Sequence, residues 1–334
     1  MPSNRRSRTV VVKPNDPLIY LFVRDDWYCY NPQEPPLGSG AMGDVYLGYR
    51  CRDGLVVAVK RVKDCYANNS MVRERARQEA SLVYRHPNLV EMVGYCEYAP
   101  DKGPVFLVSH FVKGENIDVY VKRIPESSNR VAKICNSICS VLDGLDYIHS
   151  YGVVHRDIKP SNIMVENGSN IRLMDLGISC MYGGNKFSSF GFIGTPQYSA
   201  PEQIDDDANG QKQINATTDI YQLGITFYEL LTNENPMDCP SEADTLNRQI
   251  KEPLPSSPKI PKRLMQVIWK ATEKDQAKRY QTAIDFKNAI IAAQQPEESF
   301  FRRFSSWMQD HFVLMISIVS LLVVLVFLLV LILI

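Results

Sequence analysis

The hydrophobic and polar positions divide the chain into a front part with strand patterns and a rear part with helix patterns. Runs rich in β-branched and aromatic residues predict strands over residues 18–30, 45–47, 55–62 and 105–111. Asp53-Gly54 joins the second run to the third and is a hairpin signal. After Gly114 the apolar spacing becomes helical, over residues 130–150, 217–231, 262–272 and 283–294. Strands followed by helices predict an α+β protein with a sheet-rich front lobe and a helical rear lobe.

One further helix is predicted inside the front part, over residues 71–85, because this segment is charged and contains alanines. His86-Pro87 ends it. Residues 1–17 are polar and basic and predict a disordered arm. The expected organisation is an N-terminal arm with one or two short strands, a front lobe, a rear lobe, a linker and a C-terminal helix, over residues 1–30, 31–112, 113–295, 296–311 and 312–334.

The last of these segments is apolar at every position except Ser317 and Ser320. A helix of this length would be about 34 Å long, enough to cross a hydrocarbon core of about 30 Å. A soluble helix that apolar would need protein on all sides. The sequence therefore predicts a single-pass membrane protein, anchored in a lipid bilayer by residues 312–334. The rest of the chain is expected to face the cytoplasm, and Arg302 and Arg303 agree with that orientation.

Composition and charge add two expectations. The chain has 37 Lys and Arg against 37 Asp and Glu, so no net charge draws it to nucleic acid, and no nucleic-acid partner is expected. Its eight cysteines include no C-x-x-C pair and no zinc-ligand spacing. They are expected to be reduced thiols, as in a cytosolic compartment.

The first motif with a chemical implication is a glycine run, G-x-G-x-x-G-x-V, from Gly38 to Val45. Glycines let backbone N–H groups approach phosphate oxygens without side chains in the way. The same pattern marks dinucleotide-binding folds, where a helix follows the glycines. Here the strand-forming residues Val45-Tyr46-Leu47 follow, which favours a hairpin that covers phosphates.

Further motifs follow in a specific order. On the next predicted strand a lysine lies among apolar residues, in Val57-Ala58-Val59-Lys60. Three short motifs come much later in the chain: His155-Arg156-Asp157-Ile158-Lys159-Pro160-Ser161-Asn162, Asp175-Leu176-Gly177 and Ala200-Pro201-Glu202. Each motif by itself is common. In this order and at these separations, they resemble the eukaryotic-type protein kinase domain over residues 37–293, and their wording resembles bacterial members of that family.

The resemblance implies a two-lobed kinase fold with ATP and Mg²⁺ as cofactors. It places Lys60 on the phosphates and Asp157 as the acceptor of the substrate hydroxyl proton. Asn162 and Asp175 would bind the metal, as oxygen ligands suited to a hard cation. The residues implied in nucleotide binding are Leu37, Gly38, Ser39, Gly40, Ala41, Met42, Gly43, Val45, Ala58, Lys60, His110 and Val112.

The resemblance also implies supporting roles. Lys159, two residues after Asp157, is typical of serine/threonine kinases, where it neutralises charge on the transferred phosphoryl group, and Thr195 is expected near Asp157. Asp219 resembles the aspartate that steadies the catalytic-loop backbone. Glu202 and Arg279 resemble an ion pair that ties the end of the activation loop to the rear lobe.

Some assignments stay open or depart from the family. Glu79 is the expected partner of Lys60, and Glu74 is the alternative. Leu176 replaces the usual phenylalanine without removing a catalytic group. Ser109 falls at the back of the adenine pocket, where a small residue would leave unusual room.

Regulation is open too, because Ser188 and Ser189 are candidates for phosphorylation that would pair with Arg156, and the alternative is an unmodified loop.

The function expected is ATP-dependent phosphorylation of protein serine and threonine hydroxyls by a membrane-tethered kinase. The alternatives are a membrane-anchored pseudokinase scaffold and a small-molecule kinase of related fold. A pseudokinase usually lacks an equivalent of Lys60, Asp157 or Asp175, and none is missing here. Confinement to a membrane would also favour self-association and phosphorylation between copies of the chain.

Overall fold

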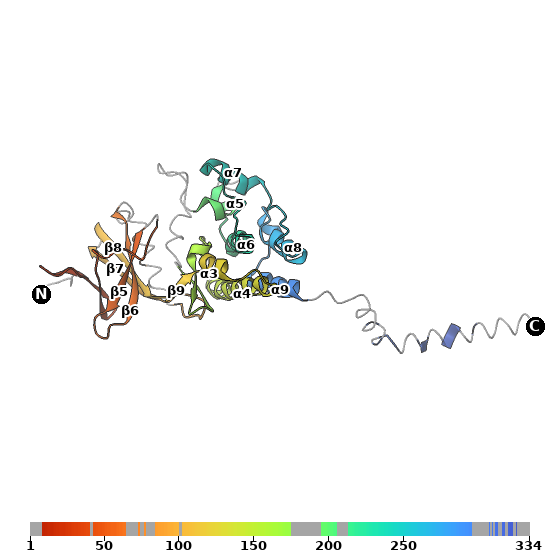
Figure 1. Cartoon of the computed structure of the whole chain (residues 1–334), viewed down its shortest axis with the longest axis horizontal. Helices are drawn as coiled ribbons and strands as arrows, with labels where there is room; N and C mark the ends of the chain where they lie inside the picture. Colours follow the sequence, from red (N-terminus) through yellow and green to blue (C-terminus); the bar gives the residue numbers. More distant parts are fainter. Residues whose placement is uncertain are drawn as a thin grey trace, which may run out of the picture. The chain divides into compact units, whose positions relative to one another are not determined.

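A computed structural model of the chain describes residues 9–40, 43–64, 73, 77, 84–99, 102–174, 195–205 and 213–295, with positions 307, 309, 311, 312, 316, 317, 320–322 and 325 near the C-terminus. The chain divides into two compact units, Met1–Ala292 and Ala293–Ile334. In the first unit the strands of the large sheet precede the main helices, as Figure 1 shows. The predicted two-lobed α+β fold is confirmed.

The front lobe is an eight-stranded antiparallel sheet with the order β1-β2-β3-β5-β6-β8-β7, in which the short strand β4 pairs with β5. Its strands are β1 Val10–Val12, β2 Ile19–Val23, β3 Asp26–Tyr30, β4 Gly38–Ser39, β5 Gly43–Arg50, β6 Val56–Val62, β7 Met92–Ala99 and β8 Lys102–His110. The predicted hairpin at Asp53-Gly54 is confirmed: β5 pairs with β6, and Gly54 has a φ of 72°, a conformation that suits glycine.

The N-terminal strands are part of the front lobe. The expectation of a disordered arm over residues 1–17 is wrong for Val10–Val12, which form β1 and pair with β2. β3 pairs with β5, and a Cβ at Gly94 of β7 would lie 2.6 Å from a methyl carbon of Val23 in β2. The two ends of the sheet therefore approach each other, and the Thr9 hydroxyl donates a hydrogen bond of 2.6 Å to the Glu97 carbonyl of β7.

The curled sheet encloses a core to which the N-terminal strands and the later strands both contribute. This core consists of Val10, Leu21, Val23, Tyr28, Tyr30, Val57, Val59, Cys96, Phe106 and Val108. Valine and aromatic side chains suit a pleated, half-buried surface, which is why runs of them form these strands. One face of the sheet is thus filled by the chain's own N-terminus.

Four residues of the predicted 71–85 helix are described: Arg73 and Arg77 are helical, whereas Tyr84 and Arg85 are not, so the helix ends earlier than predicted. Arg73 is 2% exposed and pairs with the Glu97 carboxylate, and Arg77 Nη2 lies 2.6 Å from the other Glu97 oxygen. The Tyr95 hydroxyl also donates to Glu97, at 2.8 Å. Glu97 therefore holds the Arg73 and Arg77 side chains beside β7. Glu79 and Glu74, the candidate partners of Lys60, lie outside the described residues.

The rear lobe is built around α6, which is buried along most of its length and packs against α4 and α8. Its helices are α3 Ile117–Arg123, α4 Ser128–Ser150, α5 Pro201–Ile204, α6 Ala216–Thr232, α7 Glu242–Lys251, α8 Lys262–Ala271 and α9 Ala283–Gln294. The four predicted helices match α4, α6, α8 and α9 to within two residues at each end. Asn215 begins α6 by accepting the Thr217 N–H at 2.8 Å, and Asn233 ends it with a φ of 61°.

Small elements in the rear lobe were not predicted. A second sheet has the order β11-β10-β9, with strands β9 Gly114–Asn116, β10 Ile163–Glu166 and β11 Asn170–Leu173. The short helices α3 and α7 were missed as well. Such segments carry too few apolar positions to show a period. The β10–β11 hairpin matters for the site because, in the sequence, it connects Asn162 to Met174, the residue before Asp175.

In the second unit, the rings of Trp307 and His311 stack with their centroids 4.9 Å apart. Among the positions that the structure describes, no helix is long and apolar enough to cross a membrane. Most of residues 312–334 fall outside those positions. The transmembrane helix therefore stays a prediction.

The N-terminal strands are expected to contribute to stability. Leu21 in β2 has no exposed surface, so Leu21→Ala should lower the free energy of unfolding by about 2–5 kcal/mol. Val12 in β1 is 62% exposed, and Val12→Ala should change it by less than about 0.5 kcal/mol. Urea unfolding of the two variants measures both values. Equal, small effects would show that these strands do not belong to the core.

Candidate active site

The glycine hairpin is formed by β4 and β5. The Leu37 N–H donates to the Val45 carbonyl at 2.7 Å, and the Gly40 N–H donates to the Gly43 carbonyl at 2.9 Å. A Cβ at Gly38 would meet no atom within 4 Å, whereas one at Gly43 would collide with the Arg61 carbonyl of β6. Close approach of two strands thus requires glycine at position 43. Ala41 and Met42, between Gly40 and Gly43 in the sequence, lie outside the described residues.

Four of the residues predicted to surround the nucleotide share one face of the sheet, whereas His110 lies opposite Val57 on the other face. Lys60 lies opposite Val45 in the β5–β6 ladder, and Ala58 lies opposite Ser109 in the β6–β8 ladder. Because successive side chains of a strand alternate between faces, Val45, Ala58, Lys60 and Ser109 lie on the same face. Their neighbours on β6, Val57 and Val59, point into the core. The face with Lys60 is therefore the one that the core leaves available to a ligand.

Around Asp157 lie Lys159 and Asn162 of the catalytic loop and Thr195 of the activation segment, and the sequence proposed all of them. Lys159 Nζ lies 2.8 Å from Asp157 Oδ2 and donates to the Thr195 hydroxyl at 2.6 Å. The Thr195 hydroxyl in turn donates to Asp157 Oδ1 at 3.2 Å. The Asn162 amide donates to Asp157 Oδ2 at 2.9 Å and to its backbone carbonyl at 2.8 Å. The Asp157 carboxylate is thus held from three sides.

The backbone around Asp157 is held by Asp219, which has no exposed surface. Its two carboxylate oxygens accept the N–H groups of His155 at 2.8 Å and Arg156 at 2.7 Å, and His149 Nε2 lies 2.8 Å from Oδ2. Arg156 has a φ of 69°, which is unfavourable for a residue with a side chain. The expected role of Asp219 in steadying this loop is confirmed by these hydrogen bonds.

The Asn162 side chain fits the expected metal site. Its N–H groups contact Asp157, which leaves the Asn162 Oδ1 oxygen for a hard cation. Met174, the residue before Asp175, lies beside Asn162, because its N–H donates to the Asn162 carbonyl at 2.9 Å. Asp175 itself lies outside the described residues, and the described residues contain no cluster of three His, Cys, Asp or Glu able to hold a metal.

The expected ion pair between Glu202 and Arg279 is confirmed. The Arg279 side chain has no exposed surface and lies 2.8 Å and 2.9 Å from the two Glu202 oxygens. Arg279 also donates to the Thr217 carbonyl, and its guanidinium lies 4.8 Å from the centre of the Tyr221 ring. Nearby, burial lowers the pKa of Lys274 to about 8, and the charge of Arg279 adds to the effect.

Several polar residues around the site were not predicted. Gln203 of α5 and Gln222 of α6 both donate to the Arg156 carbonyl, at 3.0 Å and 2.9 Å. Gln222 follows Asp219 by three positions on the same helix, so that helical spacing could have identified it. The Tyr198 hydroxyl donates to Glu229 at 2.6 Å, and burial raises the pKa of the Glu229 carboxyl. Each of these hydrogen bonds joins segments that are distant in the chain, and no local pattern in the sequence pairs them.

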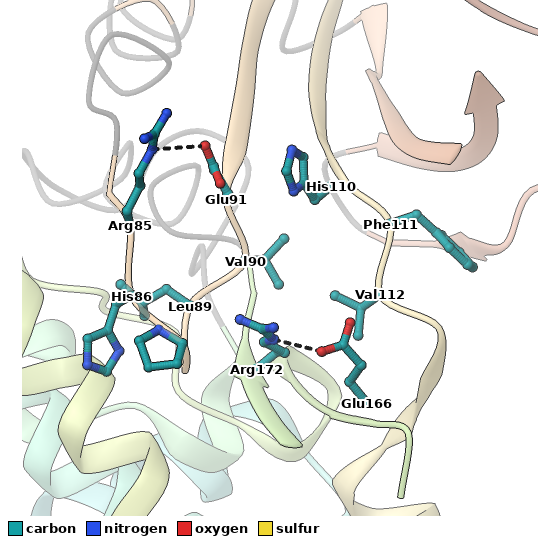
Figure 2. A pocket seen from close by; sticks show the side chains of 11 residues that line it. Arg85, His86, Leu89, Val90, Glu91, His110, Phe111, Val112, Glu166 and Arg172 are labelled. Carbon is teal, nitrogen blue, oxygen red and sulfur yellow. Dashed lines mark hydrogen bonds and ion pairs between the residues drawn. The ribbon is translucent and has the colours of Figure 1, made fainter. Parts of the chain in front are cut away.

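His110 and Val112 line a cavity of about 410 Å³ that involves none of the glycine hairpin. Figure 2 shows ion pairs on two of its walls, Arg85 with Glu91 and Arg172 with Glu166, at 3.5 Å and 3.0 Å. The Phe111 side chain points away from this cavity (Figure 2). His110 and Val112 thus lie beside this cavity, and their predicted contact with the nucleotide stays a prediction.

A family model for the protein kinase domain matches residues 32–294. The chain belongs to the protein kinase family. It is 32% identical over 270 residues to a probable serine/threonine-protein kinase PknB of Bifidobacterium longum, with 76% of this chain and 38% of that relative covered. It is 33% identical over 274 residues to the serine/threonine-protein kinase pkn2 of Myxococcus xanthus, with 77% and 32% covered. Both relatives are bacterial, as the wording of the motifs suggested.

The chain spans less than half the length of these curated relatives. Among solved structures, the kinase domain of Mycobacterium tuberculosis PknI matches with a TM-score of 0.60 and 23% identity, over 80% of this chain and 95% of that domain. This likeness shows the fold. Proteins of the family use ATP and Mg²⁺. The candidate phosphorylation sites Ser188 and Ser189 lie outside the described residues.

The buried ion pair is expected to matter for stability. Arg279→Met leaves the Glu202 carboxylate without its cation and should lower the free energy of unfolding by about 3–5 kcal/mol. The adjacent Lys278 has a side chain that is 68% exposed, so Lys278→Met should cost less than about 0.5 kcal/mol. Chemical denaturation of the two variants measures the difference. A small effect at both positions would mean that the pair is not buried in solution.

Proposed function

We propose that this protein is an ATP-dependent serine/threonine kinase that phosphorylates protein hydroxyls. The observation that carries the proposal is the cluster at Asp157, where Lys159, Asn162 and Thr195 all bond to one carboxylate. A carboxylate held from several sides is suited to orient a substrate hydroxyl and to accept its proton. Further support is that Lys60 lies opposite Val45 of the glycine hairpin in the sheet.

When bound, ATP with Mg²⁺ supplies the γ-phosphoryl group and neutralises part of its charge. Lys60 would hold the phosphates, and Asn162 and Asp175 would hold the metal. Asp157 would accept the proton from the substrate hydroxyl as that oxygen attacks. Lys159, whose ammonium lies 2.8 Å from the Asp157 carboxylate, would stabilise negative charge that develops on the transferred group.

Two observations favour serine and threonine as substrates. Lys159 and Thr195 contact each other as well as Asp157, so the residues that the sequence associated with this subclass lie together. The relatives from Bifidobacterium and Myxococcus are named serine/threonine kinases. A pseudokinase is not favoured, because Lys60, Asp157 and Asn162 are all retained on the expected elements.

The proposal predicts that Asp157→Asn strongly slows phosphoryl transfer. Asparagine cannot accept the hydroxyl proton, so kcat should fall by roughly 10²–10⁴-fold. The measurement is transfer of labelled phosphate from ATP with Mg²⁺ to a panel of serine, threonine and tyrosine peptides. Asp285→Asn, a change at the exposed start of α9, is the matched control and should retain wild-type activity. Equal activity of the wild type and Asp157→Asn would contradict the proposal.

We further propose that residues 312–334 tether the kinase to a lipid bilayer, with the catalytic domain in the cytoplasm. The support is the apolar run itself and the exposure of its described large side chains. Five of these are 48–62% exposed: Phe312, Ile316, Leu321, Leu322 and Leu325. Apolar surface of this kind is stabilised by contact with hydrocarbon.

The tether is expected to direct both location and self-phosphorylation. The full chain should sediment with membranes, and a version ending at residue 311 should stay in the supernatant. In lipid vesicles the full chain should autophosphorylate faster than the shortened version at the same low bulk concentration, because confinement raises the encounter rate between copies. Fractionation and labelled-phosphate incorporation measure the two effects. A full chain that partitions into the supernatant would contradict the tether.

A further inference from the structure

The two peptide groups on either side of Asp157 are held by side chains beyond Asp219. Asp219 binds the N–H groups of His155 and Arg156, which precede Asp157 in the chain. The Arg156 carbonyl and the Ile158 N–H belong to the peptide groups that flank Asp157 directly. Because Arg156 has a positive φ, this backbone keeps its shape only where the surrounding structure holds it.

Gln222 holds both of these peptide groups with one amide. Its Oε1 accepts the Ile158 N–H at 2.9 Å, and its Nε2 donates to the Arg156 carbonyl at 2.9 Å. Gln222 is 2% exposed and lies on the rigid helix α6. The network determines how the amide is oriented, because the reverse orientation would set its N–H against the Ile158 N–H. The amide therefore spans Asp157 from one side to the other.

Gln203 of α5 joins the same network. Its Nε2 donates to the Arg156 carbonyl at 3.0 Å, and its Oε1 accepts the second N–H of Gln222 at 2.8 Å. The same oxygen accepts the Ala200 N–H at 2.9 Å, at the start of α5. Ala200 follows Thr195, which itself bonds to Asp157, by five positions. The two glutamines thus connect the catalytic loop with the end of the activation segment.

We propose that Gln222 and Gln203 are positioning residues for Asp157, which set the direction of its carboxylate toward the substrate hydroxyl. Neither glutamine bonds to the Asp157 side chain. Gln222 acts through the Arg156 carbonyl and the Ile158 N–H, and Gln203 acts through the Arg156 carbonyl. In this arrangement the docking of α5 sets the geometry of the catalytic loop. The inference rests on the proposed phosphoryl transfer.

The central test is Gln222→Met in the full chain. Methionine has a similar length and volume but neither donates nor accepts these bonds, so the Asp157 backbone is released while the core stays filled. We expect kcat to fall on the order of 10–100-fold, with little change in the KM for ATP, because a small misplacement of a catalytic group has effects of this size. Gln203→Met should give a smaller loss, since Gln222 still holds the Arg156 carbonyl.

The double variant distinguishes a shared function from two separate contributions. If the glutamines act as one unit, Gln203→Met should add little to the loss in kcat that Gln222→Met already causes. The control for a lost buried hydrogen bond is Thr232→Val at the far end of α6. Thr232 is 3% exposed, and its hydroxyl bonds to the Tyr228 carbonyl. The Thr232→Val variant should lower the melting temperature as the glutamine variants do but leave kcat unchanged.

A conservative variant gives a readout that a purely structural role would not produce. In Gln222→Glu the protonated carboxyl can both accept the Ile158 N–H and donate to the Arg156 carbonyl, as the amide does. Ionised, it sets an oxygen against that carbonyl. Burial raises the pKa of a carboxyl, so the protonated form should prevail at low pH. The kcat of this variant, relative to wild type, should therefore be highest near pH 6 and fall as the pH rises.

Three outcomes overturn the inference. A folded Gln222→Met with wild-type kcat shows that the amide does not position Asp157. If Gln222→Met fails to fold, Gln222→Glu decides, and a ratio to wild type that is flat with pH rejects the proposal. Absence of phosphoryl transfer by the wild type itself overturns the proposed function and this inference together, whereas wild-type transfer with unaffected variants overturns this inference alone.

Discussion

The Asp219 carboxylate has no exposed surface, and the shape of the catalytic loop follows from the hydrogen bonds that this buried group accepts. A buried carboxylate is costly unless hydrogen bonds replace its water. Here the replacement comes from two consecutive backbone N–H groups, those of His155 and Arg156, and from the His149 ring. The two bonds fix the backbone as far as the Arg156 N–H, and the positive φ of Arg156 then bends the chain as it continues. Asp157 is the next residue, so its position depends on this bend.

The first turn of α6 serves as a common anchor for three segments that are distant in the sequence. The Thr217 carbonyl binds Arg279, the Thr218 hydroxyl donates to Glu202 at 2.7 Å, and Asp219 binds the catalytic loop. The N-terminal end of a helix carries partial positive charge, which favours the two carboxylates gathered there. One helix end therefore fixes the catalytic loop, the end of the activation segment and the Arg279 region relative to one another.

In the front lobe, the arrangement of the site depends on how the two faces of the sheet are used. Its sheet presents Lys60, Ala58 and Val45 on one face because strand side chains alternate, and the opposite face must then be covered. The N-terminal strands provide that cover: Leu21 and Tyr30 fill the core beside Val57 and Val59. Glu97 links this arrangement to the helical segment at Arg73 and Arg77. The face of the sheet that carries Lys60 thus depends on residues far from it in the chain.

The amino-acid sequence by itself determined the family, the two-lobed α+β fold and the main helices, because these depend on local patterns. Helical spacing marked α4, α6, α8 and α9, and the motifs around Lys60 and Asp157 are contiguous runs with a known order. The strand at Val10–Val12 and the closing of the sheet were not visible, since a short valine run has no period that shows what it packs against.

Beyond the contact of Thr195 with Asp157 and the pair of Glu202 with Arg279, which the family resemblance implied, only the tertiary structure decided which side chains meet. Lys159 and Thr195 are far apart in the chain, as are Gln203, Gln222 and Arg156, and their bonds form because α5, α6 and the catalytic loop pack together. Hydrogen bonding in a buried site depends on distance and direction in three dimensions, and neither is encoded in the spacing of residues along the chain.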